Sequence, residues 1–420
     1  MTGGRTVAPL RVAMLTTFYP PESFGGDAIG VQRLARALGG RGCEVTVVHD
    51  HDAYALLATG SPGAPSPDPN VDVQTLASPL GPAGLFLSHQ AGRPLVHARR
   101  LHRLLDDDRF DVIWYHNISL LGGPGLLHFG RGLKIYEAHE HWLVCPTHVL
   151  WRFGREPCDE RHCLRCLVSY HRPPQPWRYT GALERGLDHV DAIVAKSEFS
   201  RDMHRRFGFE RAMTVVPYFL PDVAMRDEGP SPSDRPYFLF VGRLEKIKGA
   251  QDILPAFAGV TGPDLVIVGS GAYEAQLREL AADKPRVRFV GRLPVDETTR
   301  YYQHAQALIV PSLCYETFGI ILIEAFRCGT PVIARRIGPF PEILAQGGGV
   351  LYEGEEQLVA AVDGIAGSPD LRHRLGRAGR AAFETTWCEN VVLRAYLDLL
   401  RGAATRKGNH RVVDALERLS

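Results

Sequence analysis

The sequence has few features that would take it to a membrane or to a polyanion. No run of apolar residues approaches the ~20 that a membrane-spanning helix requires. The formal net charge of +1 gives no overall field for nucleic acid, so we expect no nucleic-acid partner. The segment from Met1 to Pro9 has one Arg and no apolar core, unlike a secretory signal. We therefore expect a cytoplasmic protein whose cysteines are reduced.

Two further absences limit the kinds of binding site this chain could contain. No D-x-D motif stands out as a clamp for a metal and a diphosphate, so we expect no cofactor and no divalent ion for catalysis. Gly269-Ser270-Gly271 lacks the third glycine of a dinucleotide fingerprint, because Glu274 stands in its place. This excludes a nicotinamide-binding motif at that position.

What the sequence does contain is an alternation of short apolar segments and longer amphipathic ones. With 420 residues, 45% of them hydrophobic and 23% charged, the chain can form two globular domains with separate cores. The alternation predicts an α/β protein with parallel sheets wrapped by helices. The predicted strands are Arg11–Thr16, Glu44–His49, Val112–His116, Leu133–His139, Ala192–Ala195, Met213–Val216, Tyr237–Val241, Leu265–Gly269, Val287–Val290, Ala307–Val310 and Pro331–Ala334.

Local signals place two helices and one loop in the first half. A helix over Asp27–Leu38 should end at Gly39-Gly40, and Ser197 is a good N-cap for a helix that reaches about Phe207. The Pro-, Gly- and Ser-rich segment Thr59–Pro69 predicts an exposed loop.

A break in composition at residues 221–236 predicts an interdomain linker, since Gly229 to Ser233 cannot form a helix or a central strand. We expect residues 1–220 to form one Rossmann-like domain with a Cys-rich insertion at 140–180, and residues 237–386 to form a second. Residues 387–420 are amphipathic and predict a helical segment. Two facing doubly wound domains would hold ligands in the cleft between them, at the carboxyl ends of their strands.

The most informative stretch runs from Pro311 to Phe326. Glu316 follows a buried strand, and Glu324 lies in an apolar helix that is predicted to begin near Thr317 or Phe318. An eight-residue step, about two helical turns, leaves both carboxylates on roughly one side. Backbone N–H groups at the helix N-terminus form a natural anion site between them. The arrangement indicates a site for a sugar attached to a nucleoside diphosphate.

This stretch resembles the E-x7-E signature of the retaining GT-B glycosyltransferases of family 4. Other motifs follow in that family's order, and the resemblance covers nearly all of Pro236 to Trp387, while the first half matches more loosely. The first of them, Phe238 to Gly249, is a strand followed by G-R-x4-K-G. The others are Val266 to Gly271, Val287 to Leu293, Gly329 to Ala334, and Gly338 to Glu342. The resemblance implies a GT-B fold, with an acceptor-binding first domain and a donor-binding second domain. It also suggests that the C-terminal segment crosses back to the first domain.

The resemblance also implies the roles of four donor-site residues. Arg243 and Lys248 correspond to the pair that holds the diphosphate, and a forked guanidinium beside a compact ammonium suits that group. Glu316 corresponds to the acid that faces the transferred sugar, and Glu324 to the acid that binds the ribose hydroxyls. The remaining donor-binding residues implied are Gly25, Gly26, Gly242, Arg292, Leu293, Thr317, Phe318, Gly319 and Ile320.

In the first half, Phe24-Gly25-Gly26 resembles the family's glycine loop, whose backbone meets the diphosphate from the opposite wall. His139 ends a predicted strand and matches the histidine that the family places beside the sugar. The implied catalytic set is therefore His139, Glu316, Arg243 and Lys248. His116 is a second candidate for the histidine of this set. Two departures are Glu140, where the family often has Asp, and Pro217 to Leu220, which replaces an Asn-Gly turn at the hinge.

The implied function is that of a retaining hexosyltransferase. It would move a hexose-type sugar from a nucleoside diphosphate, most often UDP in this family, to a hydroxyl of a small-molecule, natural-product or saccharide acceptor. No obvious nucleophile is present, which fits a front-face displacement in which the leaving phosphate helps to deprotonate the acceptor. Catalysis would then depend on positioning and on stabilising charge.

Three other interpretations stay open. The first is an enzyme that acts on a lipid-linked acceptor at a membrane surface. It would contact the membrane peripherally through the basic and apolar segment His97 to Leu105. A non-catalytic nucleotide-sugar-binding protein of the same fold is another, and a GT-B epimerase or phosphorylase is the third. The loops at 51–80 and 140–180 are the expected acceptor determinants, but nothing in them identifies the acceptor, and the oligomeric state is not indicated.

A group of cysteines marks the predicted insertion. Four of the eight cysteines fall within 22 residues with the spacing C-x12-C-x4-C-x2-C, which includes the C-x2-C knuckle of tetrahedral zinc sites. They are Cys145, Cys158, Cys163 and Cys166, with His141, His148 and His162 as alternative ligands. In a reducing compartment we favour a structural zinc over two disulfides, and a set of free buried thiols is the alternative.

Overall fold

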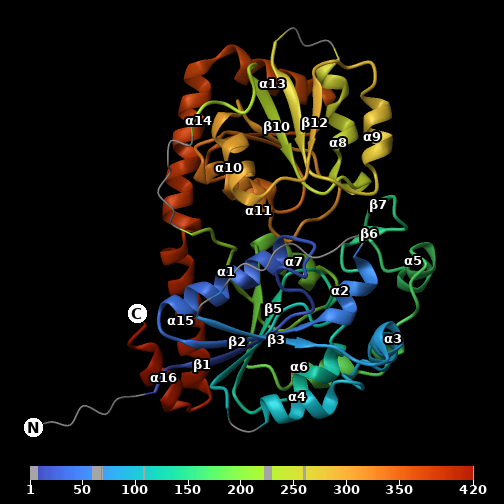
Figure 1. Ribbon diagram of the computed structural model, residues 1–420, viewed down its shortest axis with the longest axis vertical. Coiled ribbons are helices and arrows are strands. Elements are labelled where there is room, and N and C mark those ends of the chain that lie inside the picture. Colours follow the sequence, from blue (N-terminus) through green and yellow to red (C-terminus); the bar gives the residue numbers. More distant parts are fainter. Residues whose placement is uncertain are drawn as a thin grey trace, which may run out of the picture.

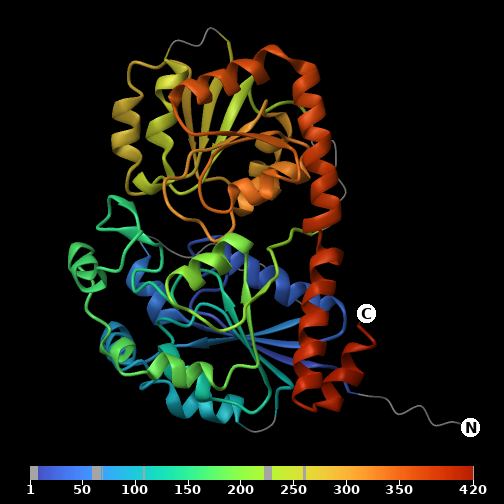
Figure 2. The same cartoon turned by 180° about the vertical axis from the view of Figure 1, so that it is seen from behind.

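The computed structural model describes residues 8–58, 68, 70–106, 109–221, 229–258 and 262–419. It contains two α/β bodies, one above the other, and a long helical arm that runs along one side of both (Figures 1 and 2). Most of the predicted loop Thr59–Pro69, and residues 222–228 of the predicted linker, lie outside the described residues. Within the described ranges, no helix combines the length and the apolar character needed to cross a bilayer.

The N-terminal body, at the bottom of Figure 1, is built on a seven-stranded parallel sheet in the order β3-β2-β1-β4-β5-β8-β9. The strands are β1 Arg11–Leu15, β2 Glu44–Asp50, β3 Val71–Leu76, β4 Val112–Tyr115, β5 Leu133–Ala138, β8 Ala192–Ala195 and β9 Thr214–Val215. The six predicted strands of this half are confirmed to within one residue at each end. Strand β3 was not predicted: it is an edge strand that pairs only with β2.

Helices surround this sheet and carry the insertion. They are α1 Gly26–Gly40, α2 His51–Leu57, α3 Gly81–Ala91, α4 Ala98–Leu105, α5 Cys163–Ser169, α6 Ala182–Leu187 and α7 Glu198–Arg206, with 3-10 turns at Gly123–His128 and Pro176–Tyr179. The insertion adds a small antiparallel hairpin, β6 Trp151–Arg152 and β7 Glu156–Pro157. The Ser197 cap is confirmed, because its hydroxyl accepts a hydrogen bond from the N–H of Ser200.

The C-terminal body, at the top of Figure 1, has a six-stranded parallel sheet in the order β12-β11-β10-β13-β14-β15. Its strands are β10 Tyr237–Val241, β11 Asp264–Val268, β12 Val287–Gly291, β13 Leu308–Val310, β14 Val332–Arg335 and β15 Gly349–Tyr352. Its helices are α8 Ala250–Ile253, α9 Glu274–Leu280, α10 Val295–His304, α11 Ile320–Arg327, α12 Phe340–Leu344, α13 Glu355–Gly367 and α14 Pro369–Ala382, with 3-10 turns at Lys246–Lys248 and Pro255–Phe257. Strand β15, the edge strand after a run of glycines, was not predicted.

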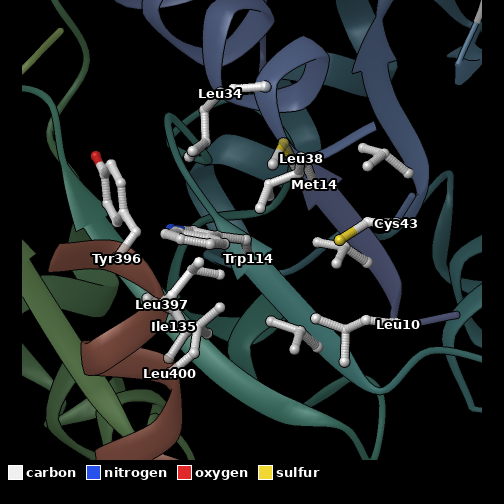
Figure 3. Close-up of a cluster of buried hydrophobic side chains, with 14 of the residues drawn as sticks. Leu10, Met14, Leu34, Leu38, Cys43, Trp114, Ile135, Tyr396, Leu397 and Leu400 are labelled. Atoms are coloured by element: carbon white, nitrogen blue, oxygen red, sulfur yellow. The ribbon is translucent and has the colours of Figure 1, made fainter. Parts of the chain in front are cut away.

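The helical arm joins the two bodies. Helix α14 leads through a π-helical turn, Phe383–Trp387, into α15 Glu389–Arg406 and then α16 His410–Leu416. In Figure 3, Tyr396, Leu397 and Leu400 of α15 pack toward Trp114 and Ile135 of the first sheet. Leu397 and Leu400 are at most 1% exposed, so α15 forms part of the hydrophobic core of the N-terminal body.

Both strand orders reverse direction beside their first strand. In the N-terminal body this switch point lies between β1 and β4, and in the C-terminal body between β10 and β13. In open α/β sheets, ligands bind outside the carboxyl ends of the strands at such points. The loops that follow these four strands are therefore where a site is expected.

Candidate active site at the domain interface

Lys248 and Glu316 meet at the switch point of the C-terminal body. Lys248 ends the 3-10 turn after β10, Glu316 lies in the loop after β13, and the Lys248 Nζ is 2.5 Å from Glu316 Oε1. Ser312 donates a hydrogen bond to the same oxygen at 3.1 Å. Burial alone would raise the pKa of Glu316, but Lys248 and Ser312 lower it, and Glu316 in turn raises the pKa of Lys248 against the effect of burial. Both groups are therefore charged at neutral pH.

A glycine permits this meeting of two loops. Gly249, directly after Lys248, has a φ of 75°, in the left-handed region. A Cβ added there would lie 2.0 Å from the carbonyl oxygen of Pro311 in the other loop. No side chain fits, so the glycine lets the backbone of the first loop lie directly against the second.

The other predicted cations point elsewhere in this structure. Arg243 is 56% exposed and pairs with Glu245 at 2.6 Å, and Arg292 is exposed after β12. Leu293 packs against the hydrophobic core of the C-terminal body. A Cβ at Gly242 would meet only Phe240 at ordinary distance, so sterics alone do not require glycine there. Of the two diphosphate cations, Lys248 pairs directly with Glu316, whereas Arg243 acts on Glu316 through its charge alone and helps to lower the pKa of that carboxyl.

The helix after the E-x7-E loop begins later than predicted. Helix α11 spans Ile320–Arg327 and its N-cap is Gly319, so the predicted start at Thr317 or Phe318 is wrong. Gly319 has a φ of 110°, and a Cβ there would lie 2.8 Å from the ring of Phe340. Phe318 is 3% exposed and packs against Tyr218, which ties the residue before the cap into the core. The backbone therefore turns into the helix only after Gly319.

Glu324 lies on α11 and contacts both bodies. Its Oε2 accepts a hydrogen bond from the hydroxyl of Tyr302 on α10 at 3.0 Å. Its Oε1 is 3.5 Å from Nη2 of Arg33, on α1 of the N-terminal body. The two carboxylates of the motif thus have separate partners, Glu316 in the loop and Glu324 at the contact between the bodies.

The glycine loop of the N-terminal body faces α11. A Cβ on Gly26 would lie 3.1 Å from Cδ1 of Ile320, the first residue of α11. Gly25 has an extended backbone that any residue can adopt. The predicted loop and the predicted helix N-terminus therefore lie on opposite sides of the same interface.

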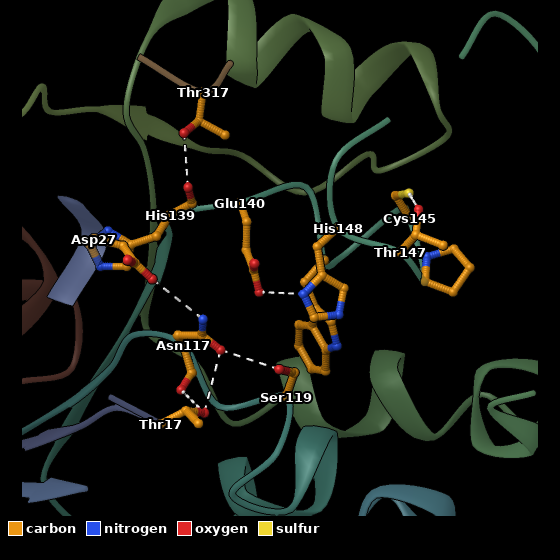
Figure 4. Close-up of polar contacts among 12 residues, drawn as sticks. Thr17, Asp27, Asn117, Ser119, His139, Glu140, Cys145, Thr147, His148 and Thr317 are labelled. Atoms are coloured by element: carbon orange, nitrogen blue, oxygen red, sulfur yellow. Dashed lines mark hydrogen bonds and ion pairs between the residues drawn. The ribbon is translucent and has the colours of Figure 1, made fainter. Parts of the chain in front are cut away.

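Polar side chains cover the end of the first sheet beside this loop. In Figure 4, Asp27 at the start of α1 faces Asn117, which follows β4, and the amide donates to Asp27 Oδ2 at 3.5 Å. Ser119 donates to Asn117 Oδ1 at 3.2 Å, and Glu140 lies 2.8 Å from His148. Burial, followed by the charge of Glu140, raises the pKa of Asp27. This wall contains hydrogen-bond acceptors and two carboxylates near one another.

His139 and His116 are the two strand-end histidines, and both are buried. The Nε2 of His139 is 2.9 Å from Nδ1 of His116, and its Nδ1 is 2.5 Å from the hydroxyl of Tyr218. Burial lowers the pKa of His139 well below its usual range, although Glu137 opposes this. The ring is therefore neutral at neutral pH, and both of its nitrogens have partners inside the protein. Its backbone carbonyl reaches across to the other body, accepting from Thr317 Oγ1 at 2.8 Å (Figure 4).

A buried polar network lies behind these histidines. Lys196 pairs with Glu137 and donates to the hydroxyl of Tyr396 on α15 at 2.6 Å, and Tyr396 donates to Glu137 at 2.8 Å. Burial would raise the pKa of Glu137, but Lys196 and the two imidazoles lower it to about 2. The network connects the helical arm to the strand ends at the interface.

Further hydrogen bonds hold the two bodies together around the site. Ser197 donates to the carbonyl of Thr317 at 2.7 Å. The carboxylate of Glu342, on α12, accepts from the N–H groups of Glu198 and Phe199 at 3.0 Å each and so caps α7 from the other body. The loop around Thr317 is thus bonded to two segments of the N-terminal body.

The four clustered cysteines surround the β6–β7 hairpin and the start of α5. Cys145 and Cys166 are buried, and Cys158 and Cys163 are half-buried. The N–H of Phe153 donates to the sulfur of Cys166 at 3.5 Å, and the four thiols lie near enough for their charges to interact. In the described part of the chain, the groups of three metal-ligating side chains with ligand atoms within 4.8 Å of one another lie elsewhere. They are His116, Glu137 and His139, and Asp50, Asp52 and His97.

The second of these groups contains a D-x-D motif that the sequence analysis did not single out. Asp50-His51-Asp52 follows β2, where Asp50 accepts from the N–H of Ala53 and Asp52 from that of Ser78. His97 lies 3.5 Å from Asp50. Both carboxylates satisfy backbone groups, and the motif belongs to the N-terminal body rather than to the loops around Lys248.

Sequence reasoning missed Asp27, Asn117, Arg33 and Tyr302. The first two had a usable signal, since Asp27 follows the Gly25-Gly26 pair directly and Asn117 follows a strand. Arg33 and Tyr302 had none, because each is one of many such residues on an amphipathic helix. Their role depends on which helices the tertiary fold brings together.

Family models match both halves of the chain. The family model described as Glycosyltransferase Family 4 matches residues 24–220, and the model described as Glycosyl transferases group 1 matches residues 223–382. A D-inositol 3-phosphate glycosyltransferase from Pseudarthrobacter chlorophenolicus is 26% identical over 96% of this chain and 97% of its own. A glycogen synthase from Mycobacterium tuberculosis is 26% identical over 94% and 96%.

Solved structures support the same fold. Sucrose-phosphate synthase from Thermosynechococcus elongatus superimposes with a TM-score of 0.71 at 19% identity, covering 94% of this chain and 100% of its own. Anabaena HepE, solved in complex with UDP, gives a TM-score of 0.62 at 16% identity, covering 94% and 100%. The paired parallel sheets, the E-x7-E loop and these matches together show that the chain is a glycosyltransferase enzyme that belongs to family 4 and has the GT-B fold.

Proposed function

We propose that this protein moves a hexose-type sugar from a nucleoside diphosphate, with UDP as the favoured carrier, to a hydroxyl group of an acceptor, with retention at the anomeric carbon. The observation that carries the proposal is the pairing of Lys248 with Glu316 at the switch point of the C-terminal body, across the interface from Gly26. A cation for the diphosphate and a carboxylate for the sugar then lie side by side. The UDP complex of the HepE neighbour favours UDP.

The proposed step is a front-face displacement. The acceptor oxygen bonds to the anomeric carbon on the face from which the diphosphate leaves, and the bond from that carbon to the phosphate oxygen breaks. The diphosphate keeps the bonding electron pair and takes the acceptor's proton. Lys248 neutralises the charge that builds up, and Arg243, on its exposed stem, exchanges Glu245 for a phosphate oxygen. Glu316 accepts hydrogen bonds from the sugar.

The N-terminal wall favours a neutral hydroxylic acceptor. Asp27, Asn117 and Glu140 offer oxygens that accept hydrogen bonds from hydroxyl groups, and the carboxylate of Glu140, whose charge helps to raise the pKa of Asp27, would repel a phosphate. We therefore favour a small-molecule, natural-product or saccharide acceptor over a phosphorylated or lipid-phosphate one.

We assign His139 a positioning role within the catalytic set rather than proton transfer. Both of its ring nitrogens are engaged by His116 and Tyr218, and the ring is neutral. Its carbonyl bond to Thr317 holds the loop that contains Glu316 against the N-terminal body.

The experiment that tests the function is release of nucleoside diphosphate. The protein is incubated with UDP-, GDP-, ADP- and dTDP-sugars and a panel of neutral and phosphorylated acceptors, and proton NMR of the product gives its anomeric configuration. Acceptor-dependent release with retained configuration is expected. Binding without release would support a non-catalytic protein, and sugar phosphate formed from inorganic phosphate would support a phosphorylase.

We also propose that Cys145, Cys158, Cys163 and Cys166 hold a structural zinc ion. The hairpin, the C-x2-C at the start of α5 and the hydrogen bond from Phe153 to a cysteine sulfur are features of zinc knuckles. Binding would draw the sulfur atoms closer together than they lie here. One zinc per chain by elemental analysis, lost in Cys163→Ser, is expected. If the protein contains no zinc and these four thiols can be titrated, the four cysteines are free thiols and the proposal is wrong.

A further inference from the structure

Helix α1 of the N-terminal body contacts α11 of the C-terminal body. Gly26 at the start of α1 faces Ile320, the first residue of α11. Arg33, about two turns further along α1, reaches Glu324, about one turn further along α11. The helix that contains the proposed ribose-binding acid is thus contacted at two points from the opposite body.

Glu324 has a partner on each carboxylate oxygen. The Tyr302 hydroxyl donates to Oε2 at 3.0 Å, and Arg33 Nη2 lies 3.5 Å from Oε1. An ionised carboxylate accepts about four hydrogen bonds, two on each oxygen. One acceptor direction on each oxygen therefore stays available, which suits two neighbouring hydroxyl groups such as the 2′- and 3′-hydroxyls of a ribose.

The charge of Arg33 matters because the site is shielded from water. The Arg33 side chain is 13% exposed and that of Glu324 is 21% exposed. Burial lowers the pKa of Arg33 while Glu324 raises it, and a guanidinium stays protonated in proteins. A nucleotide that covers Glu324 would remove more of its water, and the adjacent positive charge offsets that cost.

Tyr302 supplies orientation from within the C-terminal body. It is 2% exposed, and its backbone carbonyl accepts from Thr330 Oγ1 at 2.6 Å, which fixes the end of α10. Its hydroxyl is therefore held in place and limits the rotamers open to Glu324. This contact lies within one body, whereas the Arg33 contact exists only when the two bodies touch.

We propose that Tyr302 and Arg33 are positioning residues for the ribose: Tyr302 orients Glu324, and Arg33 completes the ribose site from the opposite body, so that ribose recognition depends on the contact between the bodies. The inference rests on the proposed role of Glu324 in nucleotide binding. Neither residue touches the reacting atoms, so both act through Glu324.

The test compares ribonucleotides with 2′,3′-dideoxynucleotides by calorimetry on the full chain. The native protein should bind the ribonucleoside diphosphate at least tenfold more tightly than its dideoxy analogue. Tyr302→Phe and Arg33→Gln should each weaken ribonucleotide binding by roughly tenfold, the size expected for one hydrogen bond to a charged group, and leave dideoxynucleotide binding unchanged. Arg33→Lys should recover part of the loss.

Matched controls separate this effect from damage to the fold. Tyr301→Phe changes the neighbouring residue, whose ring packs against Tyr237, and Arg36→Gln changes the arginine one turn further along α1, which pairs with Asp68. Both should keep the native preference. Dideoxynucleotide affinity serves as the internal check that each variant is folded.

The outcomes distinguish this inference from the proposed function. If the native protein binds no nucleoside diphosphate, the proposed function fails and the inference fails with it. If it binds ribo- and dideoxynucleotides equally, the ribose role of Glu324 is wrong. If it discriminates but Tyr302→Phe and Arg33→Gln discriminate as well as the native protein, the inference alone is overturned.

Discussion

The ammonium of Lys248 lies 2.5 Å from the carboxylate of Glu316, although the two residues are 68 positions apart in the chain. The loops after β10 and β13 bring them together, because those strands are neighbours at the switch point of the sheet. Each group keeps the other ionised. A change at either residue therefore alters the charge state of the whole donor site.

Glu316→Gln should separate binding from turnover. The amide keeps the shape of the side chain but releases Lys248 to the diphosphate, so affinity for the nucleoside diphosphate should hold or rise. The kcat should fall by roughly 10²–10³, as when one charge-stabilising group is lost from an active site. Calorimetry with the diphosphate and a release assay check the two halves. A variant that no longer binds the nucleotide would show that Glu316 supports the phosphate site and not the sugar.

Arg243→Ala should weaken diphosphate recognition selectively. We expect roughly a tenfold loss of affinity for the nucleoside diphosphate and little change for the nucleoside, since a charge-assisted hydrogen bond to phosphate is removed. Arg278→Ala is the matched control, an exposed arginine in a salt bridge with Glu274. Equal losses for nucleoside and diphosphate would place Arg243 outside the phosphate site.

Asp27→Asn tests the acceptor wall. The change keeps the side-chain shape but replaces one acceptor oxygen with an amide donor, so the KM for a neutral hydroxylic acceptor should rise by roughly tenfold, while donor affinity and slow donor hydrolysis stay the same. Phosphorylated acceptors should gain relative to neutral ones, because an amide N–H can donate to a phosphate oxygen. Asp72→Asn, an exposed acid on the edge strand β3, should behave like the native protein. An unchanged acceptor KM would remove Asp27 from the site.

The buried imidazoles predict loss of stability in mild acid. Burial lowers the pKa of both His116 and His204 to about 4, whereas an unfolded imidazole titrates near 6.5. As pH falls from about 6.5 towards 4, only the unfolded state takes up these protons, so the free energy of unfolding should fall by up to about 1.4 kcal/mol per pH unit for each imidazole.

Urea unfolding at pH 7.5 and 5.0 measures this slope. His204→Gln should flatten it, because one of the titrating groups is removed. If the free energy of unfolding is the same at these two pH values, the imidazoles take up protons in the folded state as readily as in the unfolded state, and the prediction is contradicted.

The fold was predictable because its signals are local. Buried parallel strands appear in a sequence as short apolar runs. These runs predict every strand of the two parallel sheets except β3 and β15. Both lie at the edge of a sheet, where one side is exposed and the apolar run is broken or follows glycines. The start of α11 was missed for a different reason: Phe318 reads as helix but is held by tertiary packing against Tyr218.

The site was predictable only in part, since a motif names residues but not their partners. Nothing in the sequence pairs Lys248 with Glu316 or turns the ring of His139 inward to Tyr218. The segment Pro217 to Leu220, which departs from the family's Asn-Gly turn, supplies that tyrosine. Arg33 reaches Glu324 only through the contact between two bodies, which no local pattern encodes.

The most direct test of a nucleotide-sugar site at Lys248 and Glu316 is thermal unfolding of the native protein and of Lys248→Ala with UDP, GDP, ADP and dTDP. A ligand at ~100 times its Kd adds about 2.7 kcal/mol to the stability of the native state, a shift that is easily measured. We predict that one diphosphate, UDP by preference, stabilises the native protein and that Lys248→Ala abolishes the shift. If no nucleoside diphosphate stabilises the native protein, or if Lys248→Ala responds as the native protein does, the account of this site is contradicted.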